Sequence, residues 1–413
     1  MRLIHTADWH LGHVLHDHPR TFEHERFLAW LLDLVESERA DALVVAGDVF
    51  DVANPPTSAL DAWFGFLASS RARFPRLELV VVGGNHDSPS RLDVTNPLLA
   101  AFRIHVVGGL PRRPDRSLDL DRLVVPLEAD GRRAAWCVAM PFLRPSDLPV
   151  VAPAADPLVE GVRAVYAEAL EAVRARRRAG EPVVALGHCY MTGTRLSELS
   201  ERRILGGNQH ALPVDVFPDD LAYAALGHLH LAQAVGGRET VRYSGSPIPL
   251  SFSETDYRHQ VCVVDLTPDS TRVRSVPVPR AVPLLRLPEG GAAPLPDVRE
   301  RLRALPALDG PESDPRRPLL EVRVRCDRPE PNLRREVEEA LAGRAPRLLR
   351  IGVELPGDAR ALAEAAPGAT LRDLSPEHVL RLRWARDHEG EPPAELLAAF
   401  SELVESVSRG EAP

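Results

Sequence analysis

Five short segments rich in aspartate, asparagine and histidine each follow a run of apolar residues. They are Asp8-Trp9-His10, Gly47-Asp48, Gly84-Asn85-His86-Asp87, Gly187-His188 and Gly227-His228-Leu229-His230. Together they supply carboxylates, one amide and several imidazoles, a mixture that favours a transition metal such as Mn²⁺ over Mg²⁺, with Zn²⁺ and Fe²⁺ as alternatives. Two divalent ions that share a carboxylate and activate water between them cleave phosphate esters. The sequence therefore predicts a two-metal centre that hydrolyses a phosphate ester.

The spacing of the residues suggests how they share the ions. Asp48 is the best candidate for the bridging carboxylate, because such a group holds two ions ~3.5–4 Å apart. Asp8 and His10 have one residue between them, so an extended segment turns both toward one ion. His228 and His230 have the same spacing.

The remaining residues of the five segments complete the centre. Asn85 offers a carbonyl oxygen to the second ion, and His188 completes the coordination of that ion. His86 lies between Asn85 and Asp87, and a carboxylate bound to one imidazole nitrogen fixes the tautomer and raises the basicity of the ring. We interpret His86 as a catalytic residue, oriented by Asp87, that stabilises the charge of the transition state or protonates the leaving oxygen.

Alternating strands and helices over the first 275 residues position these segments, as in a layered α/β domain. We predict strands at residues 2–7, 42–46, 79–82, 104–107, 134–139, 183–186, 222–226 and 261–266, and helices at 22–39, 58–73 and 159–178. The candidate ligands follow the carboxyl ends of strands, the edge at which open α/β sheets bind ligands. Isolated Gly-Asp or Gly-His pairs occur by chance, but this shared position argues for a function.

The pattern changes after about residue 280. We predict a domain over 1–280, an α+β module over 281–355, a linker over 356–370 and two helices within 371–413. The module contains strands 284–287, 319–326 and 348–353 and helices 296–305 and 332–341, and the tail helices cover 375–388 and 393–408. The second tail helix has an apolar stripe, which fits the groove of a partner or the body of this chain.

Composition limits the remaining functions. The chain has 413 residues and a net charge of −9, so a strong hold on DNA by this chain alone is not expected. No apolar run approaches the ~20 residues that span a bilayer. The four scattered cysteines suit reduced thiols in the cytoplasm. The chain contains no lysine and hence no phosphate-binding GxxxxGK[ST] loop, so any dependence on ATP must come from a partner.

With these residues in place, the chain resembles the calcineurin-like metallophosphoesterase superfamily and, within it, the family of nuclease subunits of SbcCD complexes. The matching segments are 5–12, 46–51, 84–88, 141–144, 225–230 and 243–252. The last segment contains no proposed ligand and separates this family from other phosphoesterases. The resemblance is strong over about 1–285 and looser in the tail, at 374–377 and 392–397.

The resemblance implies a four-layer α/β/β/α metallophosphoesterase domain, a smaller α+β cap and C-terminal helices. It implies one ion on Asp8, His10, Asp48 and His230, and another on Asp48, Asn85, His188 and His228. His86 takes the place of the catalytic histidine. The implied activity is a Mn²⁺-dependent nuclease, with 3′→5′ exonuclease action on duplex DNA and endonuclease action on single strands and hairpins.

The resemblance also implies partners: DNA, a coiled-coil ATPase subunit of the SbcC type and a second copy of the nuclease subunit within a heterotetramer. Such a complex works in DNA repair, recombination and replication in the cytoplasm, in association with the nucleoid. The module 281–355 would face DNA, and the tail would dock on the ATPase. Two alternatives remain open: a stand-alone phosphodiesterase for nucleotides or other small esters, and a scaffold without catalytic activity.

Overall fold

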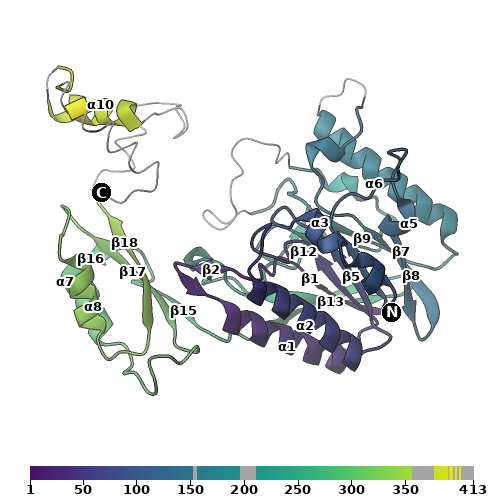
Figure 1. Cartoon of the computed structure of the whole chain (residues 1–413), viewed down its shortest axis with the longest axis horizontal. Coiled ribbons are helices and arrows are strands. Elements are labelled where there is room, and N and C mark those ends of the chain that lie inside the picture. Colours follow the sequence, from purple (N-terminus) through teal and green to yellow (C-terminus); the bar gives the residue numbers. More distant parts are fainter. Residues whose placement is uncertain are drawn as a thin grey trace.

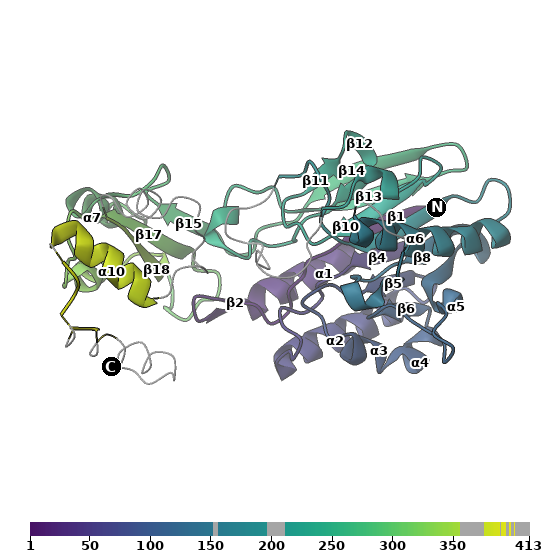
Figure 2. The same ribbon diagram turned by 90° about the horizontal axis from the view of Figure 1, so that it is seen from above.

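The computed structural model of this chain describes residues 1–151, 156–195, 211–355, 376–388, 390–393, 396–397 and 400. Two six-stranded sheets pack face to face, and helices cover their outer faces (Figure 1). This arrangement confirms the predicted four-layer α/β/β/α domain. A smaller module with its own sheet lies at one end of the molecule (Figure 2).

The first sheet has the order β14-β13-β1-β4-β5-β6, where β1, β4, β5 and β6 are parallel and β13 and β14 form an antiparallel hairpin. Its strands are β1 (Arg2–Thr6), β4 (Ala42–Ala46), β5 (Glu78–Val82), β6 (Ile104–Val107), β13 (Gln260–Leu266) and β14 (Thr271–Pro277). The helices of this half are α1 (Thr21–Glu38), α2 (Thr57–Arg73), α3 (Pro89–Asp93) and α4 (Asn96–Ala100).

The second sheet has the order β11-β12-β10-β9-β8-β7, with four parallel strands in its centre. Its strands are β7 (Val124–Ala129), β8 (Arg132–Ala139), β9 (Val183–His188), β10 (Tyr223–Gly227), β11 (Gln233–Val235) and β12 (Arg238–Tyr243). The helices of this half are α5 (Leu120–Leu123) and α6 (Pro157–Arg176), with 3₁₀ turns η1 (Pro145–Asp147) and η2 (Val214–Val216) nearby.

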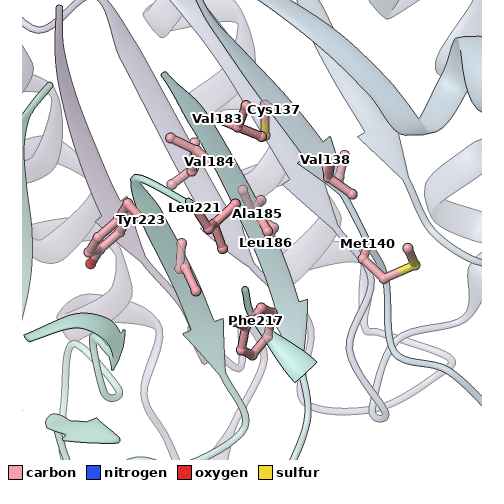
Figure 3. Packing of buried hydrophobic residues seen from close by; sticks show 14 of the residues in the cluster. Cys137, Val138, Met140, Val183, Val184, Ala185, Leu186, Phe217, Leu221 and Tyr223 are labelled. Carbon is pink, nitrogen blue, oxygen red and sulfur yellow. The ribbon is translucent and has the colours of Figure 1, made fainter. Parts of the chain in front are cut away.

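Both faces of the first sheet are buried, which explains why its parallel strands are mostly apolar. Successive side chains of a strand point to opposite faces. Val44 in β4 belongs to the core between the sheets, whereas Leu43 and Val45 belong to the core beneath α1 and α2. Figure 3 shows part of the first core, where side chains of β8, β9 and β10 pack with Phe217.

The smaller module consists of β15 (Leu284–Leu287), β16 (Ala293–Pro294), β17 (Leu319–Arg325) and β18 (Arg347–Glu354), with α7 (Leu295–Arg303) and α8 (Leu333–Leu341). All its strand pairs are parallel and involve β17. Both helices pack on one face of this sheet around a separate apolar core. We call this module the cap.

A short hairpin, β2 (Val14–Leu15) and β3 (His18–Pro19), lies between the larger domain and the cap in both views (Figures 1 and 2). Leu15 packs in a small apolar cluster with the 3₁₀ turn η3 (Phe252–Glu254), with Val282 before β15, and with the starts of β15 and β17. We call this group, Leu15, Phe252, Val282, Leu284 and Leu319, the junction cluster.

The structure contains every strand and helix predicted before residue 355, with ends shifted by a few residues. The prediction missed the strands β2, β3, β7, β11, β12, β14 and β16, several of which lie at or near sheet edges, and the short helices α3, α4 and α5. In the tail, α10 (Pro376–Asp387) corresponds to the predicted helix 375–388. The linker 356–370 and most of the predicted helix 393–408 fall outside the described residues.

Among the described residues, no helix is both long enough and apolar enough to cross a membrane.

Candidate metal centre

The five predicted segments converge at the carboxyl ends of strands from both sheets. Asp8 and Asp48 follow β1 and β4, Asn85 follows β5, His188 ends β9 and His228 follows β10. The loops after β1 and β4 run side by side, since the Asp8 amide donates to the Gly47 carbonyl and the His10 amide to the Asp48 carbonyl, each at 3.0 Å. The carboxyl ends of the strands of both packed sheets therefore bring these residues together.

The backbone at the centre adopts conformations that most residues avoid. Asp8, His10 and Asp48 have φ values of 54°, 48° and 49°, and His228 has a φ of 105°. Left-handed geometry is uncommon outside glycine, although Asp, Asn and His are enriched in it. Strain of this kind persists where the surrounding structure enforces it, and it concentrates at functional sites.

Glycines at the strand ends allow the loops to approach closely. Gly47 has a φ of +92°, and a β-carbon there would lie 2.1 Å from His188 Nδ1. A β-carbon at Gly227 would lie 1.9 Å from the Ala46 carbonyl oxygen. Glycine at these positions permits tight turns. The structure adds a second reason, since the two sheets meet without room for a side chain.

Asp48 occupies the middle of the centre. Its Oδ2 lies 3.6 Å from His10 Nε2 and 3.4 Å from His188 Nε2. Its Oδ1 accepts a hydrogen bond of 2.9 Å from the His86 amide. One carboxylate oxygen thus faces an imidazole from each sheet, the position that a bridging ligand needs.

Asn85 joins the two histidines of the second sheet. Its Oδ1 lies 2.9 Å from His188 Nε2 and 3.0 Å from His228 Nδ1. These three atoms and Asp48 Oδ2 form a compact set of oxygen and nitrogen donors. The residues that carry these atoms, Asp48, Asn85, His188 and His228, are the four that the resemblance assigns to one ion.

Hydrogen bonds away from the centre orient three of the imidazoles. His188 Nδ1 lies 2.9 Å from the Ala46 carbonyl, His10 Nδ1 lies 3.1 Å from Asp51 Oδ1, and His230 Nδ1 lies 3.0 Å from Glu254 Oε1. Carbonyl and ionised carboxylate oxygens only accept, so Nδ1 donates, and in the neutral form of each ring the lone pair lies on Nε2. Histidine ligands of metals commonly have such a partner behind the ring.

Buried atoms without partners indicate that the centre suits metal ions. Among the described residues, Asp8 Oδ2 and His10 Nε2 are buried and lack a hydrogen-bond partner. Burial of an unpaired polar group is costly, and coordination of a cation removes that cost. The donor set of carboxylate, amide and imidazole suits divalent ions.

Two groups of side chains bring their ligand atoms within 4.8 Å of one another. One contains Asp8, Asp48 and His188, and the other contains His10, Asp48 and His86. Asp48 belongs to both groups, as expected for a shared ligand. The groups divide the remaining residues differently from the resemblance, so the assignment of each ligand to an ion stays a prediction.

The charges of the centre influence one another. Burial disfavours ionisation of Asp48, but the imidazoles of His188, His10 and His86 hold the pKa of its carboxyl well below the usual value. Burial would lower the pKa of the His188 imidazole, but Asp48 raises it to about 9. Burial and the Asp48 charge raise the pKa of Asp8 to about 6. In the metal-free chain, Asp48 and His188 therefore form a buried ion pair.

Asp87 does not orient His86, contrary to our prediction. Its Oδ1 accepts from the Phe50 amide at 2.9 Å, and its Oδ2 accepts from the amides of Gly84 and Val49 at 2.9 and 3.1 Å. The carboxylate thus ties the loop after β5 to the loop after β4. The His86 ring is held instead by the Asp51 carbonyl, 2.7 Å from Nδ1.

Sequence reasoning missed the supporting roles of Asp51 and Glu254. Asp51 lies in the matching segment 46–51, but its sequence position does not reveal that it contacts both His10 and His13, at 3.1 Å each. Glu254 lies far along the chain from His230 and belongs to no predicted segment. Burial opposes ionisation of Glu254, but His230 keeps the pKa of its carboxyl below the usual value.

Comparisons with known proteins place this architecture in a family. A family model described as calcineurin-like phosphoesterase matches residues 1–232, and another described as type 5 capsule protein repressor C-terminal domain matches residues 280–388. The chain is 42% identical over 385 residues to the SbcD subunit of the SbcCD nuclease of Rhodobacter capsulatus, an alignment that covers 91% of this chain and 93% of the relative.

Two further relatives carry the same name. The chain is 34% identical over 297 residues to the SbcD subunit of Escherichia coli K12, with 69% of this chain and 71% of the relative covered. It is 36% identical over 275 residues to that of Bacillus subtilis, with 65% and 67% covered. The chain therefore belongs to the calcineurin-like phosphoesterases and, within them, to the SbcD family of SbcCD nuclease subunits, whose members are hydrolases of phosphodiester bonds.

Proposed function

We propose that this chain hydrolyses DNA phosphodiesters with two Mn²⁺ ions, as a 3′→5′ exonuclease on duplex DNA and an endonuclease on single strands and hairpins. The observation that carries the proposal is the position of Asp48 Oδ2, 3.6 Å from His10 Nε2 and 3.4 Å from His188 Nε2. We assign Asp8, His10, Asp48 and His230 to one ion and Asp48, Asn85, His188 and His228 to the other.

Divalent ions in such a centre stabilise the charge on the phosphoryl oxygens and lower the pKa of water. We assign the remaining proton transfer to His86. The Asp51 carbonyl lies 2.7 Å from His86 Nδ1 and can only accept, so Nδ1 keeps its proton and Nε2 is the nitrogen that exchanges one. His86 would protonate the leaving oxygen, a role that contributes ~10²–10⁴-fold to rates in other enzymes. Asp87 holds the loop in which His86 lies.

The presence of the cap favours a polymeric substrate, such as DNA, rather than a small ester. Its sheet carries α7 and α8 on one face, and alternation along the strands places Arg286, Arg323 and Arg350 on the other. On that same face, Leu284 and Leu319 belong to the junction cluster and Leu349 packs against it, so the face turns toward the larger domain. We propose that the cap, residues 281–355, contributes arginines to the DNA phosphates, because such contacts supply most non-specific affinity.

We further propose that the chain works with a coiled-coil ATPase subunit of the SbcC type. The relatives are named as subunits of a complex. The chain itself contains no lysine and so no GxxxxGK[ST] loop. The tail, residues 371–413 after the linker 356–370, would dock on that partner. Its place of action would be the cytoplasm, in association with the nucleoid.

A homodimer of this chain is part of the same proposal. Val94, Leu98 and Phe102 are 73%, 65% and 47% exposed, a concentration of apolar surface at α3 and α4. Exposed apolar patches of this kind mark association surfaces. A second copy is the occupant that we propose, since one patch can serve both subunits of a symmetric dimer.

A substrate comparison tests the proposed activity. The purified chain, with and without its ATPase partner, is incubated with Mn²⁺ and labelled hairpin DNA, linear duplex DNA or bis-p-nitrophenyl phosphate. We expect cleavage of both DNAs and shortening of the duplex from its 3′ ends. Turnover of the small ester alone would favour a stand-alone phosphodiesterase. If none of the three substrates is cleaved, the chain would be interpreted as a scaffold without catalytic activity.

A further inference from the structure

The segment from Tyr243 to Glu254 contains no proposed metal ligand, yet its backbone contacts the ligand loops closely. The Ser246 amide donates to the His230 carbonyl at 3.1 Å. A β-carbon at Gly245 would lie 2.6 Å from that same carbonyl oxygen. The Leu250 carbonyl lies 2.9 Å from His13 Nε2. The segment therefore packs against His230 on one side and against the start of the β2–β3 hairpin on the other.

Glu254, at the end of η3, holds the ring of His230. Its side chain is fully buried, with Oε1 3.0 Å from His230 Nδ1 and Oε2 accepting from the Leu250 amide at 2.8 Å. Both oxygens thus face hydrogen donors. The carboxylate requires His230 to carry its proton on Nδ1, so the lone pair that can coordinate a metal lies on Nε2.

Phe252, at the start of the same turn, belongs to the junction cluster. It is 3% exposed and packs with residues of the hairpin and the cap. The His16 ring stacks on it with ring centroids 5.9 Å apart and an interplanar angle of 17°. The η3 turn therefore has Phe252 in contact with the cap and Glu254 in contact with His230, a candidate metal ligand.

We propose that Glu254 is a positioning residue that makes His230 available to its ion, and that η3 couples the placement of the cap to this ligand. The inference rests on the ligand assignment under the proposed function. A shift of the cap would move Phe252 and, through the short η3 turn, the carboxylate that fixes the His230 ring. Metal affinity at the site that contains His230 would then depend on the placement of the cap. Affinity at the site of Asn85, His188 and His228 would not.

The first test measures metal binding and not activity. Glutamine at position 254 keeps the volume but has a single acceptor oxygen, so either the Leu250 amide or His230 Nδ1 loses its acceptor. We expect wild-type protein to bind two Mn²⁺, and Glu254→Gln to retain one at wild-type affinity while the other weakens ~10–100-fold. Free Mn²⁺ is read by electron paramagnetic resonance, and circular dichroism confirms the fold.

Glu239→Gln is the matched control, because the Glu239 side chain is 77% exposed and pairs with Arg242 on the surface. We expect it to bind both ions as wild type does. Two unchanged sites in Glu254→Gln would overturn the positioning role. Fewer than two ions on the wild-type chain would overturn the proposed metal centre, and this inference with it.

The second test examines the coupling to the cap. Phe252→Leu loosens the junction cluster within η3, whereas Val282→Ala loosens the same cluster outside it. We expect Phe252→Leu to weaken the His230 site several-fold and Val282→Ala to weaken the same site less, at equal helical content, while both variants leave the site of Asn85, His188 and His228 unchanged. No effect of Val282→Ala on the His230 site, or equal weakening of both metal sites, would contradict the coupling.

Discussion

At the residue scale, one side chain of the candidate centre contacts several other residues. Asp48 Oδ2 faces imidazoles from both sheets, while Asp48 Oδ1 accepts from the His86 amide. The same residue therefore positions a candidate bridging oxygen and the backbone of the candidate acid. Removal of this carboxylate would affect both ions and the His86 loop together.

His86 offers the sharpest test at this scale. We expect His86→Ala to lower DNA cleavage by ~10²–10⁴-fold, the usual contribution of a general acid, while both Mn²⁺ ions stay bound. Cleavage rates and Mn²⁺ stoichiometry are measured on the same preparation. Retained cleavage would refute the catalytic role, and loss of one ion would show that His86 is a ligand.

The ionisation of His188 predicts how metal binding depends on pH. The His188 pKa of about 9 means that the metal-free imidazole is protonated at neutral pH, and a protonated imidazole cannot bind a metal. Metal binding must therefore release a proton, and affinity should rise as the pH rises toward about 9. Calorimetry at pH 7 in buffers with different ionisation enthalpies measures that proton. Binding enthalpy that is independent of the buffer would contradict the prediction.

The same shift affects the stability of the metal-free fold. The His188 pKa is raised above the unfolded-state value of about 6.5, so the stabilisation is complete below that pH and disappears as the pH rises through about 9. Urea unfolding of the metal-free chain should show this loss. Replacement of His188 by glutamine should remove the pH dependence in this window.

At the scale of elements, the sequence predicts those strands and helices that have a clear local pattern of apolar residues. Apolar runs identify the central strands. The segments after β1, β4, β5, β9 and β10 come together because the parallel strands of each sheet end at one edge and the two edges lie at the same end of the packed sheets. The edge strand β7 contains Pro126, and β14 alternates polar and apolar residues, so neither forms an apolar run. The contact of Glu254 with His230 depends on tertiary packing, and no local pattern encodes it.

Substitution by alanine should have opposite effects at two glycines, because only one of them lies where the two sheets pack closely. Gly227→Ala would place a β-carbon 1.9 Å from the Ala46 carbonyl oxygen, and we expect a loss of ~1–3 kcal/mol in the free energy of unfolding. Gly65 in α2 has no atom within 4 Å of such a β-carbon, so Gly65→Ala should add ~0.5–1 kcal/mol. Urea unfolding measures both, and a stable Gly227→Ala would contradict the described contact.

The whole molecule combines a metal-binding domain with a cap and a proposed surface for a second copy. Leu98 is 65% exposed and, with Val94 and Phe102, contributes to this apolar surface. We expect Leu98→Glu to shift the chain from dimer to monomer without loss of fold, because the new charge opposes burial in the interface. Sedimentation velocity measures the change. A wild-type chain that is monomeric at micromolar concentration would contradict the proposed dimer.

The proposed centre requires two ions that share Asp48. A crystal of the full chain with Mn²⁺, measured at an X-ray energy where manganese scatters anomalously, locates each ion directly. We expect two peaks ~3.5–4 Å apart, with the Asp48 carboxylate in contact with both and an imidazole from each sheet beside it. A single peak, or two peaks that do not share Asp48, would contradict the proposed centre.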